Sequence, residues 1–151
     1  MIKLKITTLL FLNLFFGNFI YSQGLAANFG YHYAGRSAGF AGVDYRLSME
    51  QDPAKNIGIG AYLTSINKGF TIIPEIHYNQ VINNDSGLMW QISASTKNLK
   101  PSLGFNFLNT IHLDVGYSFG LNKAKDLHGF AVGANFFLGK KRFYDTFKII
   151  Q

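Results

Sequence analysis

Several residue types are scarce or missing in this chain of 151 residues. It contains no cysteine and only three prolines, and charged residues make up 15% of it. The lack of cysteine excludes disulfides, thiolate metal sites and cysteine nucleophiles. The low charged fraction argues against a disordered or strongly acidic chain. After residue 22, no apolar run approaches the roughly 18 residues that a transmembrane helix needs.

The net charge of +6 is unevenly distributed along the chain. Lys3 and Lys5 lie in the first 22 residues, and the last twelve residues hold four basic side chains against Asp145. The segment 23–139 therefore carries only +1. Nucleic-acid binding needs clustered lysine and arginine. Because the segment has no such cluster, we expect no nucleic-acid partner.

Residues 1–22 have the order of regions found in a secretory signal peptide. Two lysines are followed by an apolar run from Ile6 to Phe16 and then by smaller residues up to Ser22. This order matches the n-region, h-region and cleavage region of such a signal. We expect cleavage between Ser22 and Gln23 after export through the inner membrane. An exported chain without cysteine favours a bacterial envelope.

From residue 24 onward, apolar and polar residues alternate instead of following helical spacing. In the run 111–120, for example, Leu113 and Val115 share one face while Asp114 and Gly116 share the other. Such alternation, broken by clusters of Gly, Asn, Asp and Lys, predicts antiparallel strands joined by turns. Eight runs show it: 25–33, 41–47, 57–64, 70–79, 88–95, 102–107, 111–120 and 129–138.

The composition of the two faces indicates which one points outward. The apolar faces carry no charge, and the opposite faces are rich in Gly and Ser, whereas a solvated surface usually carries many Lys and Glu. Aromatic residues lie toward the strand ends, as in the girdles of membrane barrels. The sequence therefore predicts an all-β fold, an eight-stranded antiparallel up-and-down transmembrane β-barrel. Its predicted lipid-facing residues include Val43, Ile59, Ile76, Ile92, Phe105, Val115 and Val132.

The inner face of this barrel is predicted to hold a polar network. Its members are Asp44, Arg46, Glu75, His77, Lys97, His112 and Asp114. Charges in a narrow lumen of low dielectric must pair, so we expect ion pairs and hydrogen bonds that fill the interior. The alternative is a gated path for ions or small molecules. Gly116 is also on the inner face, and we expect Gly116→Ser to be better tolerated than Val115→Arg.

The signal, the strand count and the alternation resemble the small eight-stranded outer-membrane barrels of Gram-negative bacteria, the OmpA and OmpX type. The resemblance covers about residues 23–139 and implies architecture rather than activity. It implies location in the outer membrane with lipid as a partner, and we expect a monomer. Such barrels often end on an aromatic residue. Phe136 or Phe137 is predicted to fill that role, with the basic tail 140–151 outside the barrel.

No catalytic or cofactor motif is evident. His112, Asp114 and Ser118 share the inner face, but Ser118 lies six residues from His112, about 20 Å along a strand. They cannot form a Ser-His-Asp triad by themselves. The four histidines lack metal-ligand spacing. We therefore expect no enzymatic activity, no metal and no cofactor.

Three functions fit these patterns. The first is an outer-membrane barrel with a structural or interaction role, in which the tail 140–151 could dock a periplasmic partner. The second is a narrow channel for ions or small solutes, and the third is a soluble periplasmic barrel that carries a ligand. Pro74 falls inside the run 70–79 and predicts a β-bulge there, with a lateral opening as the alternative.

Overall fold

The structure is a computed structural model, and it describes residues 24–48, 52–66, 69–83, 87–121 and 127–144. The predicted signal peptide, residues 1–22, lies outside the described residues. So do residues 145–151 of the basic tail. Among the described residues, no helix is long and apolar enough to cross a membrane.

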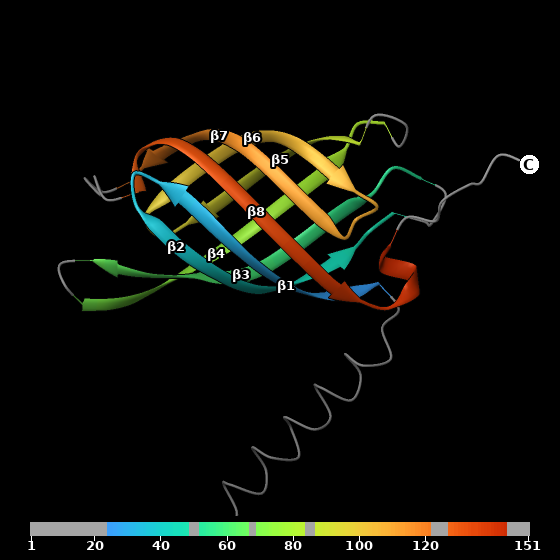
Figure 1. Cartoon of the computed structure of the whole chain (residues 1–151), viewed down its shortest axis with the longest axis horizontal. Helices are drawn as coiled ribbons and strands as arrows, with labels where there is room; N and C mark the ends of the chain where they lie inside the picture. The colour runs from blue at the N-terminus through green and yellow to red at the C-terminus, as the bar shows by residue number, and fades with distance from the viewer. Residues whose placement is uncertain (1–23, 49–51, 67–68, 84–86, 122–126, 145–151) are drawn as a thin grey trace, which may run out of the picture.

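Eight antiparallel strands form a closed barrel. Every strand pairs with its neighbours in the sequence, and β8 also pairs with β1 (Figure 1). The predicted eight-stranded antiparallel up-and-down barrel is therefore confirmed. The strands are β1 Leu25–Ala34, β2 Ser37–Arg46, β3 Lys55–Ile66, β4 Gly69–Val81, β5 Leu88–Ser95, β6 Asn98–Phe107, β7 Ile111–Gly120 and β8 Gly129–Gly139.

The strands are tilted because the register shifts around the barrel. The shift is seen by moving from each residue to its partner on the next strand, once around the barrel. Starting at Ala34 of β1, the successive partners are Ala131, Gly116, Ser102, Gln91, Asn79, Asn56 and Arg46. The backbone N–H of Arg46 then donates to the Gly24 carbonyl at 2.8 Å, ten residues before Ala34. Closure with such a stagger requires a tilt of about 35–45°. A strand of ten residues then spans about 25 Å along the barrel axis.

The two ends of the barrel differ. The hairpins β1–β2, β3–β4, β5–β6 and β7–β8 lie at one end, which we call the hairpin end (Figure 1). The start of β1 and the end of β8 lie at the other, which we call the terminus end. Buried apolar side chains from several strands and from Leu127 pack at the hairpin end: Ala38, Phe40, Tyr62 and Ile73.

The chain continues past β8 into a short segment that packs against the terminus end. This segment, residues 140–144, contains the 3₁₀ helix η2 (Lys141–Phe143), and we call it the C-terminal turn. Phe143 is fully buried and clusters with Ala26 and Phe137. Within this segment Phe143 packs into the end of the barrel, whereas Lys140, Lys141 and Arg142 are exposed outside it. Phe137 points inward to meet Phe143, whereas Phe136 is exposed on the outer surface.

The β3–β4 hairpin extends beyond its neighbours (Figure 1). Its pairing runs without interruption from Lys55↔Gln80 to Ile66↔Gly69, and Ala61 lies opposite Pro74. The bulge predicted at Pro74 is therefore absent from the β3–β4 ladder. On the other side of β4, pairing with β5 stops at Glu75. Pro74 lies one residue beyond this point, where a proline costs the β4–β5 ladder no hydrogen bond.

Candidate functional site

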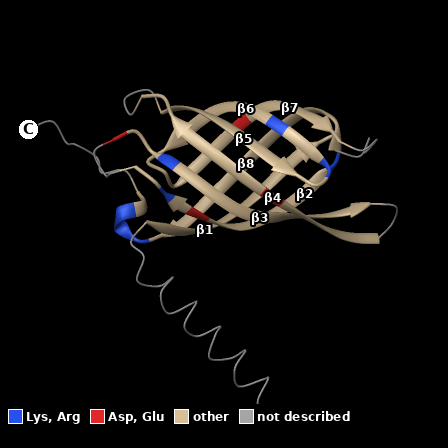
Figure 2. Ribbon diagram, turned by 180° about the vertical axis from the view of Figure 1, so that it is seen from behind, with Lys and Arg blue, Asp and Glu red and all other residues tan. Residues whose placement is uncertain are grey.

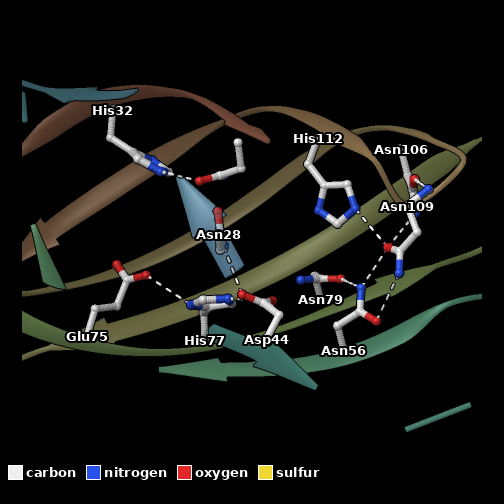
Figure 3. A network of polar contacts seen from close by, with 11 residues as sticks. Asn28, His32, Asp44, Asn56, Glu75, His77, Asn79, Asn106, Asn109 and His112 are labelled. Atoms are coloured by element: carbon white, nitrogen blue, oxygen red, sulfur yellow. Dashed lines mark hydrogen bonds and ion pairs between the residues drawn. The ribbon is translucent and has the colours of Figure 1, made fainter. Parts of the chain in front are cut away.

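The interior of the barrel is lined by polar side chains, and it is the candidate functional site. Inward positions of the strands hold acidic, basic, histidine and asparagine side chains that are almost completely buried. A polar group without water needs a partner inside the protein. The interior groups therefore form three clusters, two near the middle and one at the terminus end. Figure 3 shows contacts of the acid–histidine group and of the asparagine group, together with His32.

The first group, the acid–histidine cluster, joins β1, β2 and β4. His77 Nε2 lies 2.9 Å from Asp44 Oδ2, and His77 Nδ1 lies 3.3 Å from Glu75 Oε1. Asn28 donates to the other oxygen of Asp44 at 2.9 Å. An imidazolium has an N–H on each ring nitrogen, so a doubly protonated His77 matches both carboxylates. Gly58 of β3 leaves space here, because a Cβ at this position would overlap the His77 ring.

The second group, the lysine cluster, joins β1, β6, β7 and β8. Lys100 Nζ lies 3.1 Å from His32 Nδ1 and 3.3 Å from Asp114 Oδ2. Because an ammonium can only donate, Nδ1 of His32 accepts. Its Nε2 then donates to Asn135 Oδ1 at 3.0 Å. A Cβ on Gly133 would lie 2.7 Å from His32 Nδ1 and would overlap the Asp114 carboxylate, so this position needs glycine.

An aromatic ring separates the two central clusters. The Phe40 ring has its centroid 5.5 Å from that of His32 and 5.7 Å from that of His77, both in edge-on arrangements. With His77 doubly protonated, two cations of the central clusters face three carboxylates, those of Asp44, Glu75 and Asp114. Attraction between unlike charges offsets part of the desolvation cost of burying them.

The third group, the asparagine cluster, lies at the terminus end. Asn109 Oδ1 accepts hydrogen bonds from Asn56 at 2.8 Å, from His112 Nε2 at 3.0 Å and from Asn106 at 3.3 Å. Asn109 belongs to the β6–β7 turn and has a φ of 55°, a left-handed conformation that asparagine tolerates well. The turn thereby places one side chain where three strands can reach it.

Comparisons with protein-family models, with curated proteins and with solved structures give no match to this chain. The chemistry of the interior and the distribution of residues over the two faces are therefore the basis for the functional conclusion.

The structure brings six of the seven predicted network residues into the interior. Asp44, Glu75 and His77 meet in the acid–histidine cluster, while Asp114 belongs to the lysine cluster and His112 to the asparagine cluster. Arg46 is buried at the terminus end. There its guanidinium donates to the carbonyls of Asp52 and Phe143 and to the hydroxyl of Ser48.

Lys97 is the exception, and its predicted position is wrong. It lies in the two-residue turn between β5 and β6, and its side chain is exposed. The lysine of the interior is Lys100, which is 2% exposed. Lys100 lies an even number of residues from Ser102 and Asn106, so it points to the same face of the strand. Extending the predicted run 102–107 backward would therefore have placed Lys100 inside. The following Pro101 made this stretch resemble a turn.

The described residues do not bring His112, Asp114 and Ser118 together as a triad, and they hold no metal-binding group. Ser118 donates to the Leu127 carbonyl at the hairpin end, whereas His112 bonds to Asn109 at the terminus end. These two side chains therefore cannot act on one substrate together with Asp114. Within the described ranges, no group of three His, Asp or Glu side chains is placed to hold a metal ion.

Proposed function

We propose that this protein is an integral β-barrel of the bacterial outer membrane with a structural or interaction role and a filled interior. The observation that carries the proposal is the inverted distribution of residues. Among the described residues, 20 buried side chains are polar or charged and only 13 are hydrophobic, while 27 large hydrophobic side chains are exposed. A water-soluble barrel has the opposite arrangement, and a membrane barrel has this one.

The outer surface supports this proposal in detail. Ile59 is 63% exposed and Val115 is 53% exposed, and both lie midway along their strands. Cross-strand pairs continue this aliphatic zone around the barrel, from Val43 through Ile59 to Ile76 and from Leu103 through Val115 to Val132. The predicted lipid-facing Ile92 and Phe105 are exposed on the same surface. An apolar zone about 25 Å tall matches the hydrocarbon thickness that such barrels cross.

Aromatic side chains flank the aliphatic zone on both sides. Near the hairpin end the exposed rings are Tyr31, Tyr33, Tyr117, Phe119 and Phe130, and near the terminus end they are Tyr45, Phe105, Phe107 and Phe136. Aromatic girdles are typical of the two membrane–water interfaces. Charged residues on the described ribbon gather mainly at the two ends (Figure 2). Those in the middle, Asp44, Glu75, Lys100 and Asp114, all point inward and are buried.

The filled interior favours the structural role over the two alternatives. The cavity at the hairpin end, lined by His32, Tyr62, Lys100 and Leu127 among others, has a volume of about 10 Å³. That volume holds about one water molecule. A ligand carrier needs a far larger cavity, and a conducting barrel needs a continuous aqueous path. The proposed partner is therefore the lipid around the barrel, and the proposed state is a monomer.

Fractionation of bacterial envelopes tests this proposal. We expect the full-length chain to be exported, to lose its first 22 residues and to remain in the outer-membrane fraction after extraction with carbonate. An unheated sample should migrate faster on a denaturing gel than a heated one, since a closed barrel stays folded in detergent. Recovery in the soluble periplasmic fraction would favour the ligand-carrying barrel. Steady ion-selective conductance in planar bilayers would favour the channel.

A further inference from the structure

The C-terminal turn occupies the mouth of the barrel at the terminus end. Phe143 is 0% exposed, and its ring stacks on that of Phe137 with centroids 5.5 Å apart. Phe137 in turn packs against His112, with centroids 4.4 Å apart. A continuous series of ring contacts thus leads from the C-terminal turn to the asparagine cluster.

Polar contacts hold the same segment to interior side chains. The carbonyl of Phe143 accepts hydrogen bonds from Asn109 Nδ2 at 2.7 Å and from Arg46 Nη1 at 3.1 Å. The Tyr144 hydroxyl accepts from the Gly139 N–H at 2.6 Å and donates to the Phe137 carbonyl at 3.1 Å. The C-terminal turn is therefore bonded to the lining of the lumen as well as to the end of β8.

Arg46 extends these contacts to a second segment at the same mouth. Its Nη2 donates to the Asp52 carbonyl at 3.1 Å and its Nε to Ser48 Oγ at 3.2 Å. Ser48 and Asp52 belong to the connection between β2 and β3. One guanidinium thus joins the β2–β3 connection to the C-terminal turn across the mouth, and its planar fork suits this arrangement.

We infer that the C-terminal turn is a latch that closes the interior at the terminus end and can be released without unfolding the barrel. The β1–β8 ladder ends at the pair Ala26↔Gly139, so residues 140–144 follow the ladder and are not one of its rungs. Release therefore leaves all eight strands paired. It removes Phe143 from the mouth and uncovers Arg46 and Asn109, while the apolar cluster at the hairpin end keeps the opposite mouth closed. The inference rests on the closed barrel and does not require membrane location.

The absence of cysteine from the chain makes access to the interior measurable. Ser102 points inward from the middle of β6, is 6% exposed, and its hydroxyl has no hydrogen-bond partner among the described residues. Ser102→Cys therefore places a nearly isosteric thiol in the closed interior. The experiment measures how fast a small charged methanethiosulfonate labels this thiol in the purified, folded, full-length protein in detergent. Unheated gel mobility checks the fold of every variant.

Phe143→Ala releases the latch by removing its anchor. We expect labelling of Ser102→Cys to become at least tenfold faster in this background and to stay slow with Phe143→Leu, which still fills the mouth. The matched control is Phe136→Ala, which removes an exposed ring of β8 near the same end of the barrel and should leave the labelling rate unchanged. If Phe143→Ala does not fold, Tyr144→Phe removes only the hydroxyl contacts and should accelerate labelling severalfold. Equal rates in the unmodified background and in the folded release variants would overturn the inference.

Discussion

Replacing Lys100 by methionine tests whether the central charges hold the barrel together. Methionine keeps most of the length of the side chain but removes the ammonium group. Asp114 then loses a charge partner 3.3 Å away while it remains 2% exposed. Its other oxygen, Oδ1, is buried without a hydrogen-bond partner among the described residues. Removing one member of a buried ion pair typically costs about 3–5 kcal/mol, and we expect Lys100→Met to lower the free energy of unfolding by this amount.

A second substitution separates the charge from the packing. Asp114→Asn in the Lys100→Met background removes the unpaired carboxylate at nearly constant volume. We expect the double variant to regain much of the lost stability, with a coupling energy of about 2–3 kcal/mol in the double-mutant cycle. The Asp114→Asn variant alone should be destabilised, because Lys100 then carries the uncompensated charge.

Urea unfolding in detergent measures these differences. The chain contains one tryptophan, Trp90, whose ring packs against Tyr78, so its fluorescence reports on the β4–β5 region. Lys97→Met is the matched control, since this exposed turn lysine should change stability by less than about 0.5 kcal/mol. If Lys100→Met and Lys97→Met had the same effect, the central ion pair would contribute nothing measurable and our account of the interior would be refuted.

Three further predictions each compare a substitution with a control. Val115→Arg should lower the stability of the barrel in bilayers by about 2–4 kcal/mol and block membrane assembly, whereas Val115→Leu should assemble normally. Equal assembly of the two variants would contradict a lipid-facing position for Val115. Gly133→Ala should lower the free energy of unfolding by about 1–3 kcal/mol, because the new methyl group displaces the Asp114 carboxylate. Gly39→Ala is the control and should be nearly neutral in the same urea assay, since its Cβ would meet nothing closer than 3.9 Å. Asn109→Gly should lower the free energy of unfolding by about 1–3 kcal/mol through lost hydrogen bonds. Asn109→Ala should lower it by about 1 kcal/mol more, because alanine disfavours a positive φ. Equal losses in the two variants would show that backbone conformation plays no part.

The alternation of side chains was enough to predict the barrel and the inner face of most strands. A period of two assigns each residue to a face once the strand is recognised, and this placed Asp44, Glu75 and His77 correctly inside. It failed for Lys100 because Pro101 follows it. In the β6–β7 ladder, pairs form at Leu99 and at Ser102 but not between them. The strand therefore continues through a local interruption that resembles a turn in the sequence.

Contacts between strands could not be predicted from alternation. The contacts between side chains of neighbouring strands depend on the register of each strand pair. The alternation of apolar and polar residues does not determine that register. Gly116 shows the consequence. Its inner-face position suggested room for a side chain larger than hydrogen, but a Cβ there would lie 2.7 Å from the Ser102 Cβ and would overlap the Pro101 carbonyl. Glycine is required at position 116 because β6 and β7 approach each other closely where Ser102 pairs with Gly116. The space available in the lumen does not decide this.

The seam between β1 and β8 has a consequence for the order of folding. These strands are the first and last of the barrel, and they pair from Ala26↔Gly139 to Ala34↔Ala131. During folding, the outer edge of β1 has no partner until β8, the last strand, is in place. Pairing between such distant segments is slow, and open strand edges invite association with other chains. A chain that stops before Gly129 would expose the edges of both β1 and β7, so truncation products should aggregate rather than persist as smaller sheets.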